Sequence, residues 1–73
     1  MSTTIYSKKY KIITERLRKA RIDIGLKQEE VAKKLKKPQS YISKIERCER
    51  RIDVLELKAF AKIYRRDINF FIK

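Results

Sequence analysis

The hydrophobic residues of this chain recur at helical spacing along most of its length. The first such segment runs from about Ser7 to Ile24 and is followed by Gly25, where a left-handed residue would close a helix. The steps between its apolar residues alternate between four and three, which is the period of one helical stripe. These residues are Tyr6, Tyr10, Ile13, Leu17, Ala20 and Ile24.

Two shorter helices are predicted in the middle of the chain, over residues 28–36 and 39–46. Each is too short to be stable alone in water, so the two must pack against each other and against the rest of the chain. Pro38 cannot extend the first of them but suits the start of the second, which predicts a sharp turn between the two. Their apolar positions are Val31, Ala32, Leu35, Ile42 and Ile45.

The last third of the chain contains the clearest helix start. Asp53 and Glu56 fit the acidic variant of a capping box. Ile52 and Leu57 stand at the hydrophobic-staple positions around it. The stripe that follows is Val54, Leu57, Phe60, Ala61 and Tyr64. With a last turn over residues 68–72 and no segment of strand period, we expect an all-α fold of five helices. It would form a single domain, 1–73, in which residues 1–6 are an N-terminal arm.

The charge of the chain points to its partner. It carries 21 Lys and Arg against 9 Asp and Glu, a formal net charge of +12. Such an excess is typical of proteins that bind a polyanion, either nucleic acid or an anionic membrane surface. The basic first helix could lie on a membrane, although a solvated face over a core is the commoner arrangement. No stretch approaches roughly 18 apolar residues, and the N-terminus lacks the apolar run of a signal peptide. We expect no membrane partner.

The residues for catalysis or metal binding are scarce. Cys48 is the only cysteine and the chain has no histidine, which excludes an intrachain disulfide and a Cys/His zinc site. This usage fits a reducing, cytoplasmic location. Glu29 and Glu30 are adjacent, so on a helix they point in different directions and cannot form an acid/base dyad. We expect no enzyme, cofactor, metal or small-molecule substrate.

Polar side chains occupy the outward face predicted for residues 39–46. This face carries Gln39, Ser40, Tyr41, Ser43 and Lys44. In a strongly basic chain it predicts a helix-turn-helix that places these side chains in the major groove of double-stranded DNA. The cations expected to contact phosphates bracket it at both ends and are Lys27, Lys36, Lys37, Arg47, Arg50 and Arg51.

Four segments follow one another in the order expected for such a domain, namely GLKQEEVAKKL, PQSYISKIERCERR, IDVLELKAFAKIY and DINFF. Through them the chain, from about Leu17 to Phe71, resembles the phage repressor/Cro DNA-binding domains, the XRE family. It implies a compact lambda-repressor-like domain that regulates transcription as a homodimer on a palindromic operator, in the cytoplasm on the nucleoid. Small phage repressors, controller proteins of restriction–modification systems and antitoxins share this length. The alternative is an antitoxin-type module that neutralises a partner toxin and binds DNA secondarily.

The resemblance also implies roles for single residues. Gln39, Ser40 and Lys44 match base-reading positions. Gln28 matches a residue that grips a phosphate and steadies the first residue of the recognition helix. A glutamine amide both donates and accepts, so Gln39 suits the N6 and N7 atoms of adenine. Lys44 suits either guanine or a phosphate.

Other residues match flanking or structural positions of the family. Tyr41 and Ser43 would touch a phosphate or a thymine methyl, although Tyr41 could instead be a packing residue. Arg47 matches a phosphate contact just past the recognition helix. Arg21 and Glu46 match a pair that ties the first helix to the end of the third. A half-buried bidentate bridge would matter for stability, whereas an exposed pair would contribute little.

The chain departs from the family where glycine is usual. Those positions hold Lys36, Cys48 and Arg65 here, and each costs about 1 kcal/mol or more if it adopts a left-handed conformation. Lys27 also stands where a capping Thr or Ser is usual.

The end of the chain is unusually apolar for an exposed terminus. Its residues Phe70, Phe71 and Ile72 either complete the core or form the self-association patch of a dimer. We expect the dimer patch.

Overall fold

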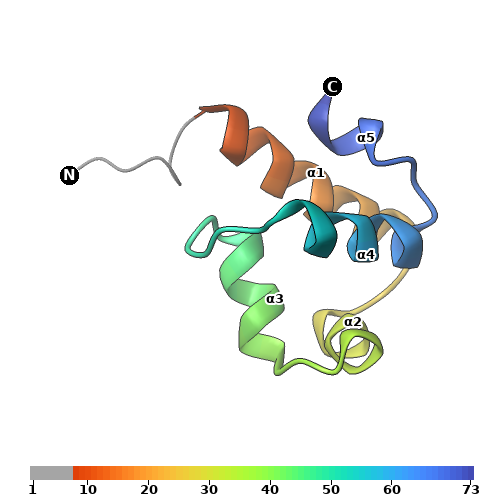
Figure 1. Cartoon of the computed structure of the whole chain (residues 1–73). Coiled ribbons are helices and arrows are strands. Elements are labelled where there is room, and N and C mark those ends of the chain that lie inside the picture. Colours follow the sequence, from red (N-terminus) through yellow and green to blue (C-terminus); the bar gives the residue numbers. More distant parts are fainter. Residues whose placement is uncertain (1–7) are drawn as a thin grey trace.

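The computed structural model describes residues 8–73 and contains the five predicted helices (Figure 1). They are α1 (Lys8–Asp23), α2 (Gln28–Leu35), α3 (Gln39–Glu46), α4 (Val54–Tyr64) and α5 (Asn69–Ile72). The described part of the chain has no strand, so the all-α prediction is confirmed. The expected N-terminal arm, 1–6, lies outside the described residues, as does Tyr6.

The helices surround one hydrophobic core to which each of them contributes. In Figure 1, α2 and α3 form the lower half, α1 and α5 the upper half, and α4 crosses between them. The helix α1 contacts α3, α4 and α5, while α2 packs mainly on α3. The largest wholly buried side chains are Phe60, Phe71, Leu17, Ile42, Ile45 and Val31. This core holds the two short central helices, which could not persist alone.

Four helix ends close in the same way, with one left-handed residue. At Gly25 φ is +82°, and at Lys36, Cys48 and Arg65 it lies between 58° and 63°. After each of them, the next backbone N–H donates to the carbonyl five residues earlier, as in a Schellman motif; the acceptors are Arg21, Ala32, Lys44 and Ala61. The three positions where glycine is usual therefore keep their left-handed geometry without it, at about 1–2 kcal/mol each.

The start of α4 confirms one prediction and corrects another. Asp53 Oδ1 accepts from the Glu56 N–H at 2.8 Å, and Glu56 Oε1 accepts from the Asp53 N–H at 2.9 Å, which is a complete capping box. Val54, however, is 63% exposed, so its predicted place in the buried stripe is wrong. The core reaches α4 only from Leu57 onward, and the capped first turn extends beyond it.

The aromatic residues at the C-terminus divide between the core and the surface. Phe71 is wholly buried, so its predicted place in a dimer patch is wrong, because α5 folds back onto α1 and inserts this ring into the core. The Phe70 ring meets it edge-on at 5.1 Å and lies under the Arg66 guanidinium at 4.4 Å. Ile72 is 52% exposed. Of the predicted patch, only Phe70 and Ile72 remain open to a partner.

Candidate nucleic-acid interface

The two central helices form a helix-turn-helix whose second helix presents a polar face. Val31 and Ala32 of α2 and Ile42 and Ile45 of α3 are buried where the two helices pack. The opposite side of α3 carries the three predicted base-reading residues, and all three are exposed; they are Gln39, Ser40 and Lys44. Ser43 is half-buried. The polar face of α3 is therefore available for a major groove, which an α-helix can enter.

Tyr41 does not belong to this face. Its side chain is only 9% exposed and its ring stacks on Phe60, with centroids 6.3 Å apart. The phenol donates a hydrogen bond to Glu56 Oε2 at 2.8 Å. The prediction that Tyr41 points outward is wrong, because its ring covers the edge of the core between α3 and α4. Burial and the contact with Glu56 raise the pKa of Tyr41 to about 12, so the phenol remains a donor at neutral pH.

Two cations lie against the same tyrosine ring. The Arg50 guanidinium carbon is 4.6 Å from the ring centroid, and Lys37 Nζ is 5.2 Å from it. Arg50 Nη2 also lies 3.3 Å from Glu56 Oε2. Each cation–π contact contributes about 0.5–1 kcal/mol where it is exposed. Tyr41 thus positions one cation from the turn before α3 and one from the loop after it.

The cations predicted to contact phosphates lie at both ends of α3. Lys27 precedes α2, Lys36 and Lys37 follow α2, and the loop after α3 carries the other three; apart from the half-buried Arg50, these residues are exposed. Arg47 forms a surface pair with Glu49 at 3.2 Å, which contributes little to stability. The arrangement is the predicted one, with cations on either side of an exposed polar helix.

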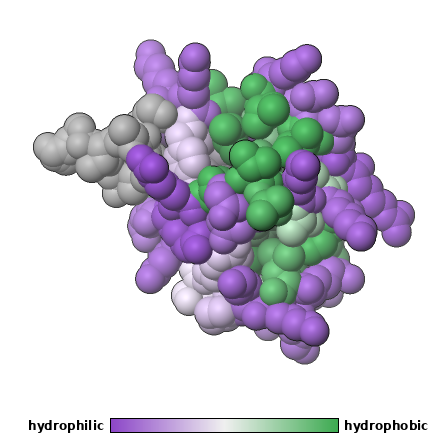
Figure 2. Space-filling model, in the orientation of Figure 1, coloured by the Kyte–Doolittle hydropathy of each residue, from purple (hydrophilic) through white to green (hydrophobic). Residues whose placement is uncertain are grey.

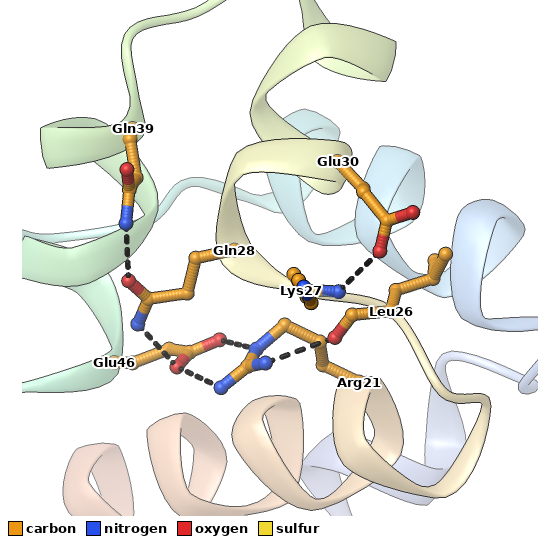
Figure 3. A network of polar contacts seen from close by, with 7 residues as sticks. All are labelled: Arg21, Leu26, Lys27, Gln28, Glu30, Gln39 and Glu46. Carbon is orange, nitrogen blue, oxygen red and sulfur yellow. Dashed lines mark hydrogen bonds and ion pairs between the residues drawn. The ribbon is translucent and has the colours of Figure 1, made fainter.

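Arg21 and Glu46 form the predicted bidentate bridge between α1 and α3 (Figure 3). Arg21 Nε donates to Glu46 Oε2 at 2.7 Å, and Nη2 donates to Oε1 at 3.0 Å. The third guanidinium nitrogen, Nη1, donates to the Leu26 carbonyl at 2.9 Å. The side chains are only 12% and 4% exposed, so removing either one would strand a buried charge.

Two glutamines extend this bridge to the recognition helix. Gln28 Nε2 donates to Glu46 Oε1 at 3.0 Å, and Gln39 Nε2 donates to Gln28 Oε1 at 3.3 Å (Figure 3). Gln28 therefore contacts the first residue of α3, as the resemblance implied. The contact between Gln28 and Glu46 was not predicted, because the two residues lie 18 positions apart and no local spacing joins them.

The start of α2 uses a cap that the sequence only partly suggests. A lysine side chain has no acceptor, so Lys27 makes no side-chain cap, as expected. Glu30 supplies the reciprocal half of a capping box, because its Oε1 accepts from the Lys27 N–H at 2.7 Å. This contact fixes the approach of the chain to Gln28.

Among residues 8–73, no group of three or more His, Cys, Asp or Glu side chains is placed to hold a metal ion. None of the helices in this part of the chain is long and apolar enough to cross a membrane.

An exposed polar helix, held in a helix-turn-helix and bracketed by cations, defines a DNA-binding protein. A comparison with protein-family models agrees, since the helix-turn-helix family HTH_3 matches residues 17–71, and the chain belongs to this family. It is a DNA-binding transcription regulator of the XRE type. A search of curated proteins found no match.

Proposed function

We propose that the chain recognises a palindromic operator as a homodimer, with α3 of each subunit in the major groove. The observation that supports base reading is the place of Gln39 at the start of α3, where the residue is exposed and its Nε2 donates to Gln28 Oε1 at 3.3 Å. Its free acceptor and remaining N–H suit adenine. Ser40 and Lys44 lie exposed on the same helix and would read or approach neighbouring base pairs.

The phosphate contacts are proposed for the cations at the two ends of α3. Their contribution is affinity and register, which are independent of sequence. Arg50 is the best positioned of them, because it contacts the Tyr41 ring and Glu56. Its backbone carbonyl also accepts a hydrogen bond from the Tyr10 phenol, which anchors the loop to α1.

The dimer surface is proposed at the first turn of α4. Val54 is 63% and Leu55 is 75% exposed. They directly follow the loop of residues 47–53, which joins α3 to α4 and carries three of the proposed phosphate-binding cations. Figure 2 shows apolar side chains over α4 and, continuing from it, over α5, with hydrophilic ones around them. An interface beside the loop that follows α3 would bring two recognition helices to one side of a dimer. Operators read by two such helices place their half-sites one turn, about 34–36 Å, apart.

The test is selection of bound duplexes from a random DNA pool with the wild-type protein. We expect a palindromic consensus whose half-sites lie one helical turn apart. A pool without enrichment would contradict sequence-specific recognition. If the protein also co-purified with a partner protein, the antitoxin-type module would replace the operator-binding regulator.

A further inference from the structure

A chain of hydrogen bonds runs from Glu46 through Gln28 to Gln39. The most buried side chain among them determines which atom donates and which accepts in each bond. Glu46 is that side chain, and both of its oxygens are occupied as acceptors. Oε2 accepts from Arg21 Nε, and Oε1 accepts from Arg21 Nη2 and from Gln28 Nε2. An ionised carboxylate can only accept hydrogen bonds. Any group that faces Glu46 must therefore present a hydrogen.

The amide of Gln28 is oriented by this requirement. Its nitrogen must face Glu46, because the flipped amide would bring Gln28 Oε1 against an oxygen of a carboxylate that is only 4% exposed. With the nitrogen toward Glu46, the amide oxygen faces Gln39. The nitrogen and oxygen of a glutamine amide can exchange places without changing its shape. The carboxylate of Glu46 selects one of the two orientations for Gln28.

The orientation passes to Gln39 by the same reasoning. The oxygen of Gln28 can only accept, so Gln39 must give it an amide hydrogen, at an N···O distance of 3.3 Å. One hydrogen and the oxygen of the Gln39 amide are left for a base. That pair matches adenine, which offers the N7 acceptor and the N6 donor. Guanine offers two acceptors, N7 and O6, and Gln39 cannot give a hydrogen to both while one is committed to Gln28.

We propose that Glu46 determines specificity without touching DNA, because it fixes through Gln28 which atoms Gln39 presents. The chain of hydrogen bonds makes adenine the preferred base over guanine at the position that Gln39 reads. This inference rests on the proposed function, in which Gln39 contacts a base.

The test uses two variants, each of which changes one residue in the series of hydrogen bonds from Glu46 to Gln39. In Glu46→Gln, either end of the new amide can face Gln28, so the direction is lost while the shape is kept. Gln28→Ala removes the link itself. Binding is measured on duplexes that carry A·T or G·C at the position where Gln39→Ala loses its preference. We expect the adenine preference of the wild type to fall roughly tenfold in both variants, with preferences at other positions unchanged.

Arg21→Lys is the matched control. It weakens the same buried bridge but leaves Glu46 charged and bonded to Gln28, so it should lower the melting temperature and keep the adenine preference. An equal loss of preference in Arg21→Lys would overturn the inference, because loosened packing would then explain the effect.

Other outcomes separate the inference from the function on which it rests. An adenine preference retained in both Glu46→Gln and Gln28→Ala would overturn the inference alone, as would a wild-type preference for guanine at that position. If Gln39→Ala changed no base preference, the proposed base reading would be overturned together with the inference.

Discussion

At the scale of a single residue, Tyr41 shows that one short helix serves both core packing and the proposed DNA contact. Its ring belongs to the core, while its hydroxyl and ring face organise Glu56, Arg50 and Lys37. The sequence left both roles open, since residue 41 lies at the border of the polar face. The structure assigns the packing role, and through Arg50 and Lys37 that role reaches the proposed phosphate contacts.

The raised pKa of Tyr41 leads to a pH-dependent prediction. The pKa of Tyr41 in the folded protein is about 12, against 10.0 for an ordinary phenol, so folding favours the neutral phenol. The resulting stability is fully present below pH 10 and is lost as the pH rises through 12. We expect wild type to exceed Tyr41→Phe in unfolding free energy by about 1–2 kcal/mol at pH 8.

This difference should shrink between pH 10 and pH 12, as measured by urea unfolding at a series of pH values. Lysine deprotonation affects both proteins alike, so the comparison isolates the phenol. A difference that stays constant to pH 12 would show that Tyr41 does not titrate in this way.

At the scale of the helices, the sequence predicted much because the signals were local. The capping box at Asp53 and the turn at Gly25 depend on neighbours within five residues. The errors at Val54 and Phe71 have the opposite origin. Whether a residue on an apolar stripe is buried depends on how far a distant helix extends over it. The spacing of apolar residues does not report the extent of that cover.

The proposed site likewise has features that the sequence predicted and contacts that it did not. The exposed face of α3 followed from helical spacing, and the Arg21–Glu46 bridge from the family resemblance. The Tyr41–Glu56 contact and the link from Glu46 to Gln28 join residues 15 and 18 positions apart. They depend on how α2, α3 and α4 are placed against one another, which no single segment encodes.

The helix ends without glycine provide a test at this scale. Arg65 closes α4 at φ 58°, so Arg65→Gly should raise the unfolding free energy by about 1 kcal/mol. The opposite change, Gly25→Ala, should lower it by a similar amount, because its φ is +82° and an added Cβ meets no atom within 4 Å. Chemical unfolding of the two variants measures both effects. A neutral or destabilising Arg65→Gly would mean that the left-handed residue carries no strain in this turn.

The whole chain has a high positive charge, and in the part that the structure describes Val54 and Leu55 are the most exposed large apolar residues. The charge predicts binding that weakens steeply with salt. Arg47→Ala should weaken binding to all DNA sequences and reduce the slope of log K against log salt by about 1 for each subunit bound. Lys62→Ala, which removes an exposed charge near the far end of α4, should leave the slope unchanged. Equal slopes for wild type and Arg47→Ala would remove Arg47 from the phosphate contacts.

The apolar surface predicts the oligomeric state. Leu55→Lys should convert the proposed dimer to monomers in sedimentation experiments, because it places a charge in the centre of the Val54–Leu55 patch. Ile72→Lys probes the C-terminal position expected from the sequence and should leave the dimer intact. Monomers from Ile72→Lys and a dimer from Leu55→Lys would move the interface to the C-terminus.

The central claim is that α3 reads bases through Gln39, and selection from a random duplex pool tests it most directly when wild type and Gln39→Ala are compared. The proposed function predicts two consensus sequences that differ at one symmetric position in each half-site, with a cost of about 1–3 kcal/mol on the wild-type site. Identical consensus sequences, or an equal loss of affinity for every sequence, would contradict it.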